Sequence, residues 1–156
     1  MHDPQHFTRF FDIHQWIFAE HTKGITPEES CRPPAGGGNS LNWVLGHIAA
    51  SRNDIHELLG APPACSAETA ELYRRGSSGV TDGAGMLRDA EIVALLAQSA
   101  QTIKERLASM SAADFARPVE KGTVGDALAF LQFHESYHAG QVGLLRRLLG
   151  KEGVIR

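Results

Sequence analysis

The sequence predicts an all-α protein, a four-helix bundle with one long crossover loop between its second and third long helices. Three observations support this prediction. Apolar residues recur every three or four positions in four long segments, most of these segments begin at residues typical of helix N-caps, and no segment shows the strict alternation of a strand. Four amphipathic helices bury one shared core, so residues 1–156 are expected to form a single domain.

The four long helices follow from their start and stop signals. Asp3 before Pro4 is typical of an N-cap followed by proline at the first helical position, and Gly24 lies just beyond the end of that helix. Thr123 with Asp126 three residues later has the spacing of a capping box at the start of the last helix. The expected long helices cover residues 4–22, 41–59, 89–110 and 123–149.

Shorter helical pieces are expected between the long ones. Thr26 and Glu29 form a capping box for one or two turns, and Ser111 opens a further short turn. The connection of residues 60–88 is rich in Gly, Ser and Pro, with one short helix expected around "AETAELYRR". A connection of this length is typical of a crossover or of a functional covering, and here it is expected to span the length of the bundle.

Composition and charge exclude several classes of function. The chain is 42% hydrophobic and 21% charged with a net charge of −3, and its basic residues are scattered, so nucleic acid is not an expected partner. Arg146, Arg147 and Lys151 are the only local basic group, and they lie at the end of an expected helix, where positive charge suits the helix dipole. No apolar run reaches the roughly 18 residues of a membrane span, so no membrane partner is expected.

The cysteines and the N-terminus indicate a cytoplasmic protein. Cys31 and Cys65 lie in expected loops without C-x-x-C spacing, which is typical of reduced thiols rather than of a disulfide scaffold. The first residues, "MHDPQHFTRFF", lack the basic and apolar regions of a signal peptide.

The stretch "FLQFHESYHAGQVGLLRRLLG" at 130–150 contains the pattern H-E-x-x-H. His134 and His138 lie one turn apart on the apolar face of the expected last helix, so their rings can converge on one metal ion. His47 lies beside the apolar stripe of the second long helix and is a candidate third ligand. Three imidazoles leave metal positions open, whereas the alternative is a set of hydrogen-bonded core histidines.

The other histidines carry weaker signals. His2 and His6 have the same spacing but straddle Pro4 at the terminus, so spacing alone is poor support for a site. His14 falls on a core stripe, either as a buried histidine satisfied by a neighbour or as an outer group of the cavity. His21 and His56, near helix ends, are expected at the surface.

The H-E-x-x-H pattern does not indicate a metalloprotease. The extended form of that motif needs a glycine and a histidine where Gln141 and Leu144 stand, and the single carboxylate downstream of His138, Glu152, lies past the expected helix end. No edge strand is expected that could hold an extended peptide. A ferritin-like di-iron site is also excluded, because the partner helices lack the E-x-x-H pairs that it needs.

Two segments carry a resemblance to a known family. "GITPEESCRPPAGGGNSLNWVLGHIAASRNDIHELLG" and "TVGDALAFLQFHESYHAGQVGLLRRLLG" resemble the DinB-like (damage-inducible, YfiT-like) superfamily, whose late H-[DE]-x-x-H-x-x-Q motif ends here at Gln141. The resemblance implies an up-down-down-up four-helix bundle, commonly a homodimer, that holds zinc or nickel. It implies the metal ligands His47, His134 and His138, and it implies no DNA binding.

The resemblance also implies a class of chemistry. Characterised relatives are S-transferases and isomerases that use low-molecular-weight thiols, and other members are described as metal-dependent hydrolases. An open three-histidine site can lower the pKa of bound water to about 7 or hold a thiolate. We therefore expect a metal-dependent thiol S-transferase or hydrolase that acts on a small electrophilic substrate, with a thiol as a candidate cosubstrate.

Two alternatives to catalysis stay open from the sequence: a metal-binding bundle without catalysis and a small-molecule-binding protein. Glu135 is the candidate catalytic residue. It lies about 100° around the helix from His134, from where it could orient a ligand histidine or accept a proton. The alternative for Glu135 is a solvated or structural carboxylate. Gln141 either lines the pocket or packs.

Overall fold

A computed structural model describes residues 3–77 and 85–155 of the chain. This part of the chain contains seven helices. No strand occurs in these two ranges, so the all-α prediction is confirmed. Three short helices accompany the four long ones. The helices are α1 (Pro4–Thr22), α2 (Pro27–Cys31), α3 (Leu41–Leu58), α4 (Ala67–Leu72), α5 (Asp89–Ala108), α6 (Ala112–Ala116) and α7 (Val124–Leu148).

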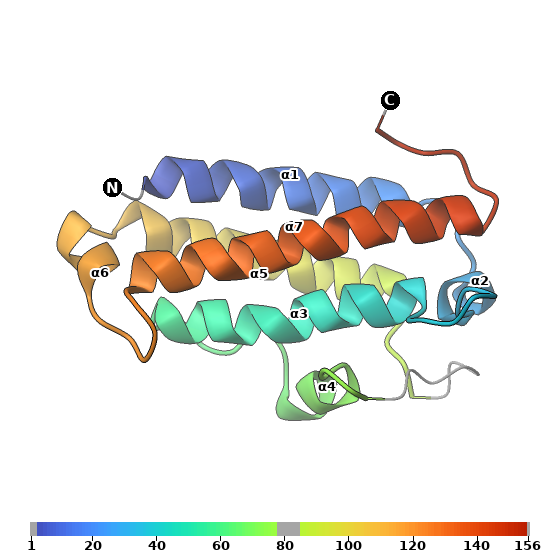
Figure 1. The fold of residues 1–156 in the computed structure, drawn as a ribbon, viewed down its shortest axis with the longest axis horizontal. Helices are drawn as coiled ribbons and strands as arrows, with labels where there is room; N and C mark the ends of the chain where they lie inside the picture. The colour runs from blue at the N-terminus through green and yellow to red at the C-terminus, as the bar shows by residue number, and fades with distance from the viewer. Residues whose placement is uncertain (1–2, 78–84, 156) are drawn as a thin grey trace.

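The four long helices lie side by side along one axis (Figure 1). α1 and α7 run in one direction, and α3 and α5 run in the other. α1 packs against α5 and α7, and α3 packs against the same two helices, so α1 and α3 lie diagonally across the group. Helix α3, which carries His47, and helix α7, which carries His134 and His138, are therefore direct neighbours.

The helix starts follow from side-chain caps. The Asp3 carboxylate accepts a hydrogen bond from the Gln5 amide, and Ser40 accepts one from the Trp43 amide. Thr123 and Asp126 form a reciprocal capping box at the start of α7. The observed bounds differ from the expected ones mainly at the end of α5, which stops at Ala108 rather than at residue 110.

The core consists of two apolar clusters. One contains Phe18, Leu45 and Val142, and the other contains Phe11, Ile55 and Leu128. Three buried polar side chains lie between these clusters along their helices: Arg52 on α3, Glu135 on α7 and His14 on α1.

The long connection after α3 packs back onto that helix through α4. Tyr73, just after α4, is fully buried against Gly46 of α3. Residues 78–84 of the expected crossover lie outside the described residues. Within the described part of the chain, no helix is both long enough and apolar enough to span a membrane.

Candidate metal centre

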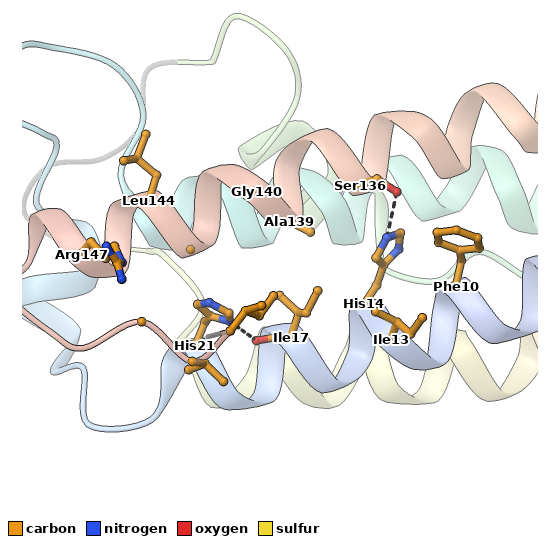
Figure 2. A pocket seen from close by; sticks show the side chains of 14 residues that line it. Phe10, Ile13, His14, Ile17, His21, Ser136, Ala139, Gly140, Leu144 and Arg147 are labelled. Atoms are coloured by element: carbon orange, nitrogen blue, oxygen red, sulfur yellow. Dashed lines mark hydrogen bonds between the residues drawn. The ribbon is translucent and has the colours of Figure 1, made fainter.

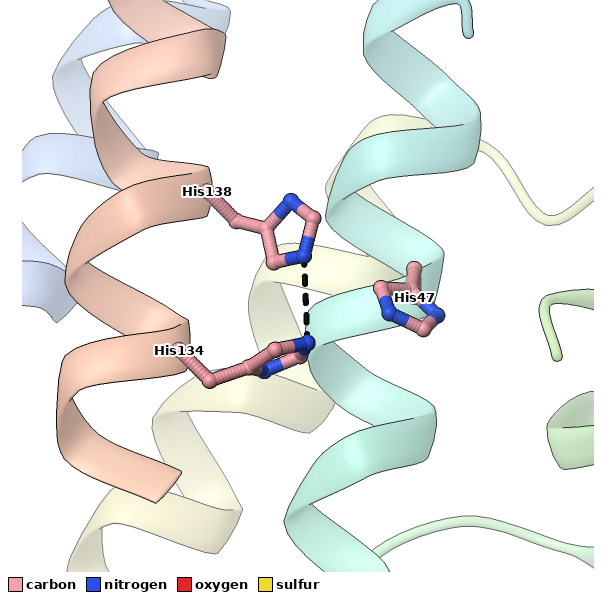
Figure 3. A group of neighbouring side chains, drawn as sticks. All are labelled: His47, His134 and His138. Carbon is pink, nitrogen blue, oxygen red and sulfur yellow. Dashed lines mark hydrogen bonds between the residues drawn. The ribbon is translucent and has the colours of Figure 1, made fainter. Parts of the chain in front are cut away.

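His47, His134 and His138 come together between α3 and α7 (Figure 3). Each offers one ring nitrogen, and these nitrogens all lie within 4.8 Å of one another. His134 and His138 are one turn apart on the face of α7 that packs against α3, and His47 projects from α3 toward them. Two helices thus present three imidazoles to one point.

The spacing of the nitrogens fits a divalent ion. The Nε2 atoms of His134 and His138 lie 3.1 Å apart. Two imidazole nitrogens bound at 2.0–2.1 Å to a tetrahedral zinc ion are separated by about 3.3 Å. The two side chains therefore need only a small adjustment to share an ion.

Outer hydrogen bonds orient two of the three rings. His47 Nδ1 lies 2.9 Å from the backbone carbonyl oxygen of Tyr73, and because a carbonyl can only accept, this nitrogen carries the hydrogen. His138 Nδ1 donates to Oε1 of Gln141 at 2.7 Å. In both rings the Nε2 lone pair is left for a metal, which is the arrangement found around metal-binding histidines.

The surroundings keep the rings in the form that binds metal. Burial lowers the pKa of His138 to about 4, with further lowering from His134 and His47 against an opposing hydrogen bond to Gln141. Burial and the neighbouring His47 also lower the pKa of His134. Both imidazoles are neutral at neutral pH, as metal coordination requires.

The group is open to non-protein ligands. His138 is 9% exposed, while His47 and His134 are half-buried. Among the described residues, no further His, Cys, Asp or Glu completes the group. Three histidines with remaining positions for exchangeable ligands are typical of catalytic rather than closed structural zinc sites. The residues present therefore fit a divalent ion.

Glu135 lies apart from this group. Its two carboxylate oxygens accept hydrogen bonds from Nη2 and Nε of Arg52, at 2.8 and 2.9 Å, and Oε1 also lies 2.9 Å from Nδ1 of His14. Burial raises the pKa of Glu135, but Arg52 and His14 more than offset this and lower that pKa to about 2. The expectation of a solvated carboxylate is wrong, because Glu135 is 2% exposed.

These contacts favour the structural role for Glu135. Both oxygens are engaged by Arg52, and a carboxylate with a pKa of about 2 is a weak proton acceptor. A role for Glu135 in orienting a ligand histidine or in moving a proton stays a prediction, and none of its hydrogen bonds among the described residues reaches a metal-site histidine.

Three other histidines and one cysteine lie where contacts between segments place them. His14 is buried and satisfied by Glu135 and by Ser136, whose hydroxyl lies 2.9 Å from Nε2. The surface placement of His21 and His56 is wrong: each is 3% exposed, because neighbouring segments cover both rings. The loop placement of Cys31 is also wrong.

His56 shows how a residue near a helix end becomes buried. Its Nδ1 donates to the carbonyl of Pro62, and its Nε2 lies 2.8 Å from the Ser99 hydroxyl on α5. Cys31 is the last residue of α2, and both it and Cys65 are buried free thiols.

Sequence reasoning missed two residues that hold candidate site residues, Tyr73 beside His47 and Arg52 beside Glu135. Tyr73 holds His47 through its main-chain carbonyl, for which its side chain gives no signal. Arg52 neutralises Glu135 from a position 83 residues away. The i, i+3 spacing of His138 and Gln141 on α7 could have indicated their contact, because such residues are neighbours on a helix surface.

Replacing Gln141 with leucine is expected to weaken zinc binding by about 10- to 100-fold, because the variant removes the acceptor that fixes the His138 ring. The free energy of unfolding should change little, since Gln141 is only partly buried. Competition titration against a chromophoric chelator measures the affinity. Gln141→Glu, which keeps an acceptor, is the matched variant and should retain zinc; equal affinities in the wild type and the leucine variant would contradict the assignment.

Comparison with known proteins adds one finding. The family model described as the DinB superfamily matches residues 11–142, a range that includes all three histidines and Gln141. No curated protein matches the chain.

Proposed function

Since the chain belongs to the DinB superfamily, we propose that it is a metal-dependent enzyme in which His47, His134 and His138 hold one zinc or nickel ion. The fold proposed for it is the up-down-down-up four-helix bundle of that family. The observation that carries the proposal is the convergence of three imidazole nitrogens within 4.8 Å, two of the rings oriented by outer hydrogen bonds.

The proposed reaction is the transfer of a thiol or of water to a small electrophilic substrate. A divalent ion held by these three histidines would supply Lewis acidity and make a thiol or water a better nucleophile. The chain's own part is to present Nε2 atoms to the ion and to hold their rings through the Tyr73 carbonyl and Gln141. The Trp43 ring stacks on His47 with its centroid 4.9 Å away, which restricts that ring further.

An exposed aromatic side chain borders the site and supports a small organic substrate. The Tyr137 ring lies 5.3 Å from that of His138, and Tyr137 is 59% exposed. Apolar surface beside a metal can bind the body of an electrophile. The same exposed surface supports a homodimer. We propose a cytoplasmic location because both cysteines are free.

Two non-catalytic functions are the alternatives. A metal-binding bundle, in which the ion ties α3 to α7, uses the same three histidines. A binding protein, in which the ion receives an anionic small molecule, differs from an enzyme only in turnover. The half-buried positions of His47 and His134 favour an exchangeable ligand over a closed structural site.

Elemental analysis of untagged protein tests the proposal. We expect about one zinc or nickel ion per chain in the wild type and less than about a tenth of that in His47→Ala and in His138→Ala, because two imidazoles hold the ion much less tightly than three. His6→Ala is the matched control, since His6 is exposed on α1 and should not affect metal content.

The outcomes separate the alternatives. A wild-type protein without metal after reconstitution, or histidine variants with full metal content, would overturn the metal centre. If the metal is present, screening of thiol transfer and hydrolysis on electrophilic substrates then distinguishes an enzyme from the two non-catalytic functions.

A further inference from the structure

A second cavity lies on the other flank of α7, between that helix and α1 (Figure 2). α7 presents its metal-site histidines to α3 and a different row of residues to this cavity. The cavity volume is about 410 Å³, which is within the range of small-molecule sites. Its lining is mainly apolar and includes Phe10, Ile13, Ile17, Gly140, Leu144 and Ile155.

Small residues of α7 leave this space open. Ala139, Gly140 and Gly143 line the cavity where larger side chains would fill it. A Cβ atom at Gly143 would lie 3.2 Å from Nε2 of His21, while one at Gly140 would meet no atom within 4 Å. The cavity beside α1 therefore exists because these α7 residues are small.

His21 presents an unpaired ring nitrogen to this cavity. The side chain is 3% exposed, and its Nδ1 donates to the Ile17 carbonyl at 2.8 Å, which fixes the ring. Its Nε2 points into the cavity and has no hydrogen-bond partner among the residues that the structure describes. Because Nδ1 carries the hydrogen, Nε2 is a hydrogen-bond acceptor, so a donor for an anionic group has to come from another residue.

Arg147 supplies a free positive charge at the same end. Arg146 donates to the main-chain carbonyls of His21 and Lys23, and Lys151 pairs with Glu29. The guanidinium of Arg147 has no hydrogen bond or ion pair within the described ranges, and it lines the cavity. Arg147 lies one turn from Gly143, about 6 Å along α7, so it is close to His21.

We propose that this α1–α7 groove binds a small amphipathic carboxylate. The guanidinium fork of Arg147 pairs with the carboxylate. The apolar chain lies along Ile17, Gly140 and Ile13 toward Phe10. From Arg147 to Ser136 the groove extends about 16 Å along α7, enough for an extended chain of about ten carbons.

Calorimetric titration of the full chain with decanoate tests this site. We expect saturable one-to-one binding with a Kd below about 1 mM in the wild type, about tenfold or more weaker binding in Arg147→Gln, and none in Gly140→Leu, whose side chain fills the groove. Decanol, which lacks the charge, should bind as weakly to the wild type as decanoate binds to Arg147→Gln.

Two exposed positions on α5 provide matched controls. Arg106, also in the last turn of a long helix, is replaced by glutamine, and Ala97 is replaced by leucine; both variants should bind decanoate as the wild type does. His47→Ala should also bind decanoate with unchanged affinity. This control separates the groove from the metal centre, because a carboxylate could also bind an ion held there.

Three kinds of result would overturn the proposal. The first is a titration without saturable binding, or with equal binding in the wild type and Arg147→Gln. The second is loss of binding in His47→Ala, which would place decanoate at the metal centre. The third is light scattering that shows a dimer dissociated by Gly140→Leu, which would assign the groove to an interface between two copies of the chain.

Discussion

Arg52→Met is expected to lower the free energy of unfolding by about 3 to 5 kcal/mol. Arg52 is completely buried, pairs with Glu135 through two hydrogen bonds and donates a third to the main-chain carbonyl of Leu96. Its removal leaves the Glu135 carboxylate in the interior with only His14 as a partner. An uncompensated buried charge is among the costliest changes that a single substitution can make.

The double variant Arg52→Met/Glu135→Met should recover most of this loss, because replacing both partners removes the unpaired charge. Arg74→Met is the matched surface control: Arg74 pairs with Glu71 where both side chains are exposed, and its loss should cost less than about 1 kcal/mol. Urea denaturation followed by circular dichroism measures all three. An Arg52→Met variant as stable as Arg74→Met would show that the buried pair contributes little.

Gly46→Ala is expected to affect stability and metal binding together. A Cβ atom at this position would lie 2.2 to 2.4 Å from three atoms of the Tyr73 ring, so the ring must move. It has little freedom to do so, because its hydroxyl donates to Asn42 and accepts from the Leu87 amide. We expect a loss of about 1 to 3 kcal/mol, typical of an overpacked core.

Movement of Tyr73 also displaces the carbonyl that holds His47. Zinc affinity should therefore fall by about 10- to 100-fold in Gly46→Ala, as for the loss of other outer partners of metal ligands. Gly140→Ala is the matched control. It lies in a helix where an added Cβ meets nothing, so it should gain about 0.5 to 1 kcal/mol and keep its zinc affinity. Similar behaviour of the two variants would contradict the packing role of Gly46.

Local patterns account for what the sequence predicted. Helix α1 has the expected bounds, because its cap, its proline and its apolar period all lie within one segment. His134 and His138 share one helix, so their convergence follows from the geometry of a single turn. His47 depended on the resemblance, since spacing alone cannot show which face of α3 meets α7.

Contacts between distant segments account for what was missed. His21 was expected at the surface because it is near the end of α1, but α7 covers it at Gly143. The burial of Glu135 was also not predicted, because the rotation of about 100° per residue turns it away from His134 and into the core. There it meets Arg52, and no periodicity in either helix identifies such a pair.

The position of the buried charges between two apolar clusters has a consequence for how α3 and α7 align. A slip of one helix past the other by a single turn, about 5.4 Å, would place Arg52 and Glu135 opposite hydrocarbon. The ion pair therefore selects one register, the register in which His47 faces His134. In the double variant, conformations in which α3 and α7 are out of register become accessible. Zinc affinity should therefore fall even though the free energy of unfolding recovers.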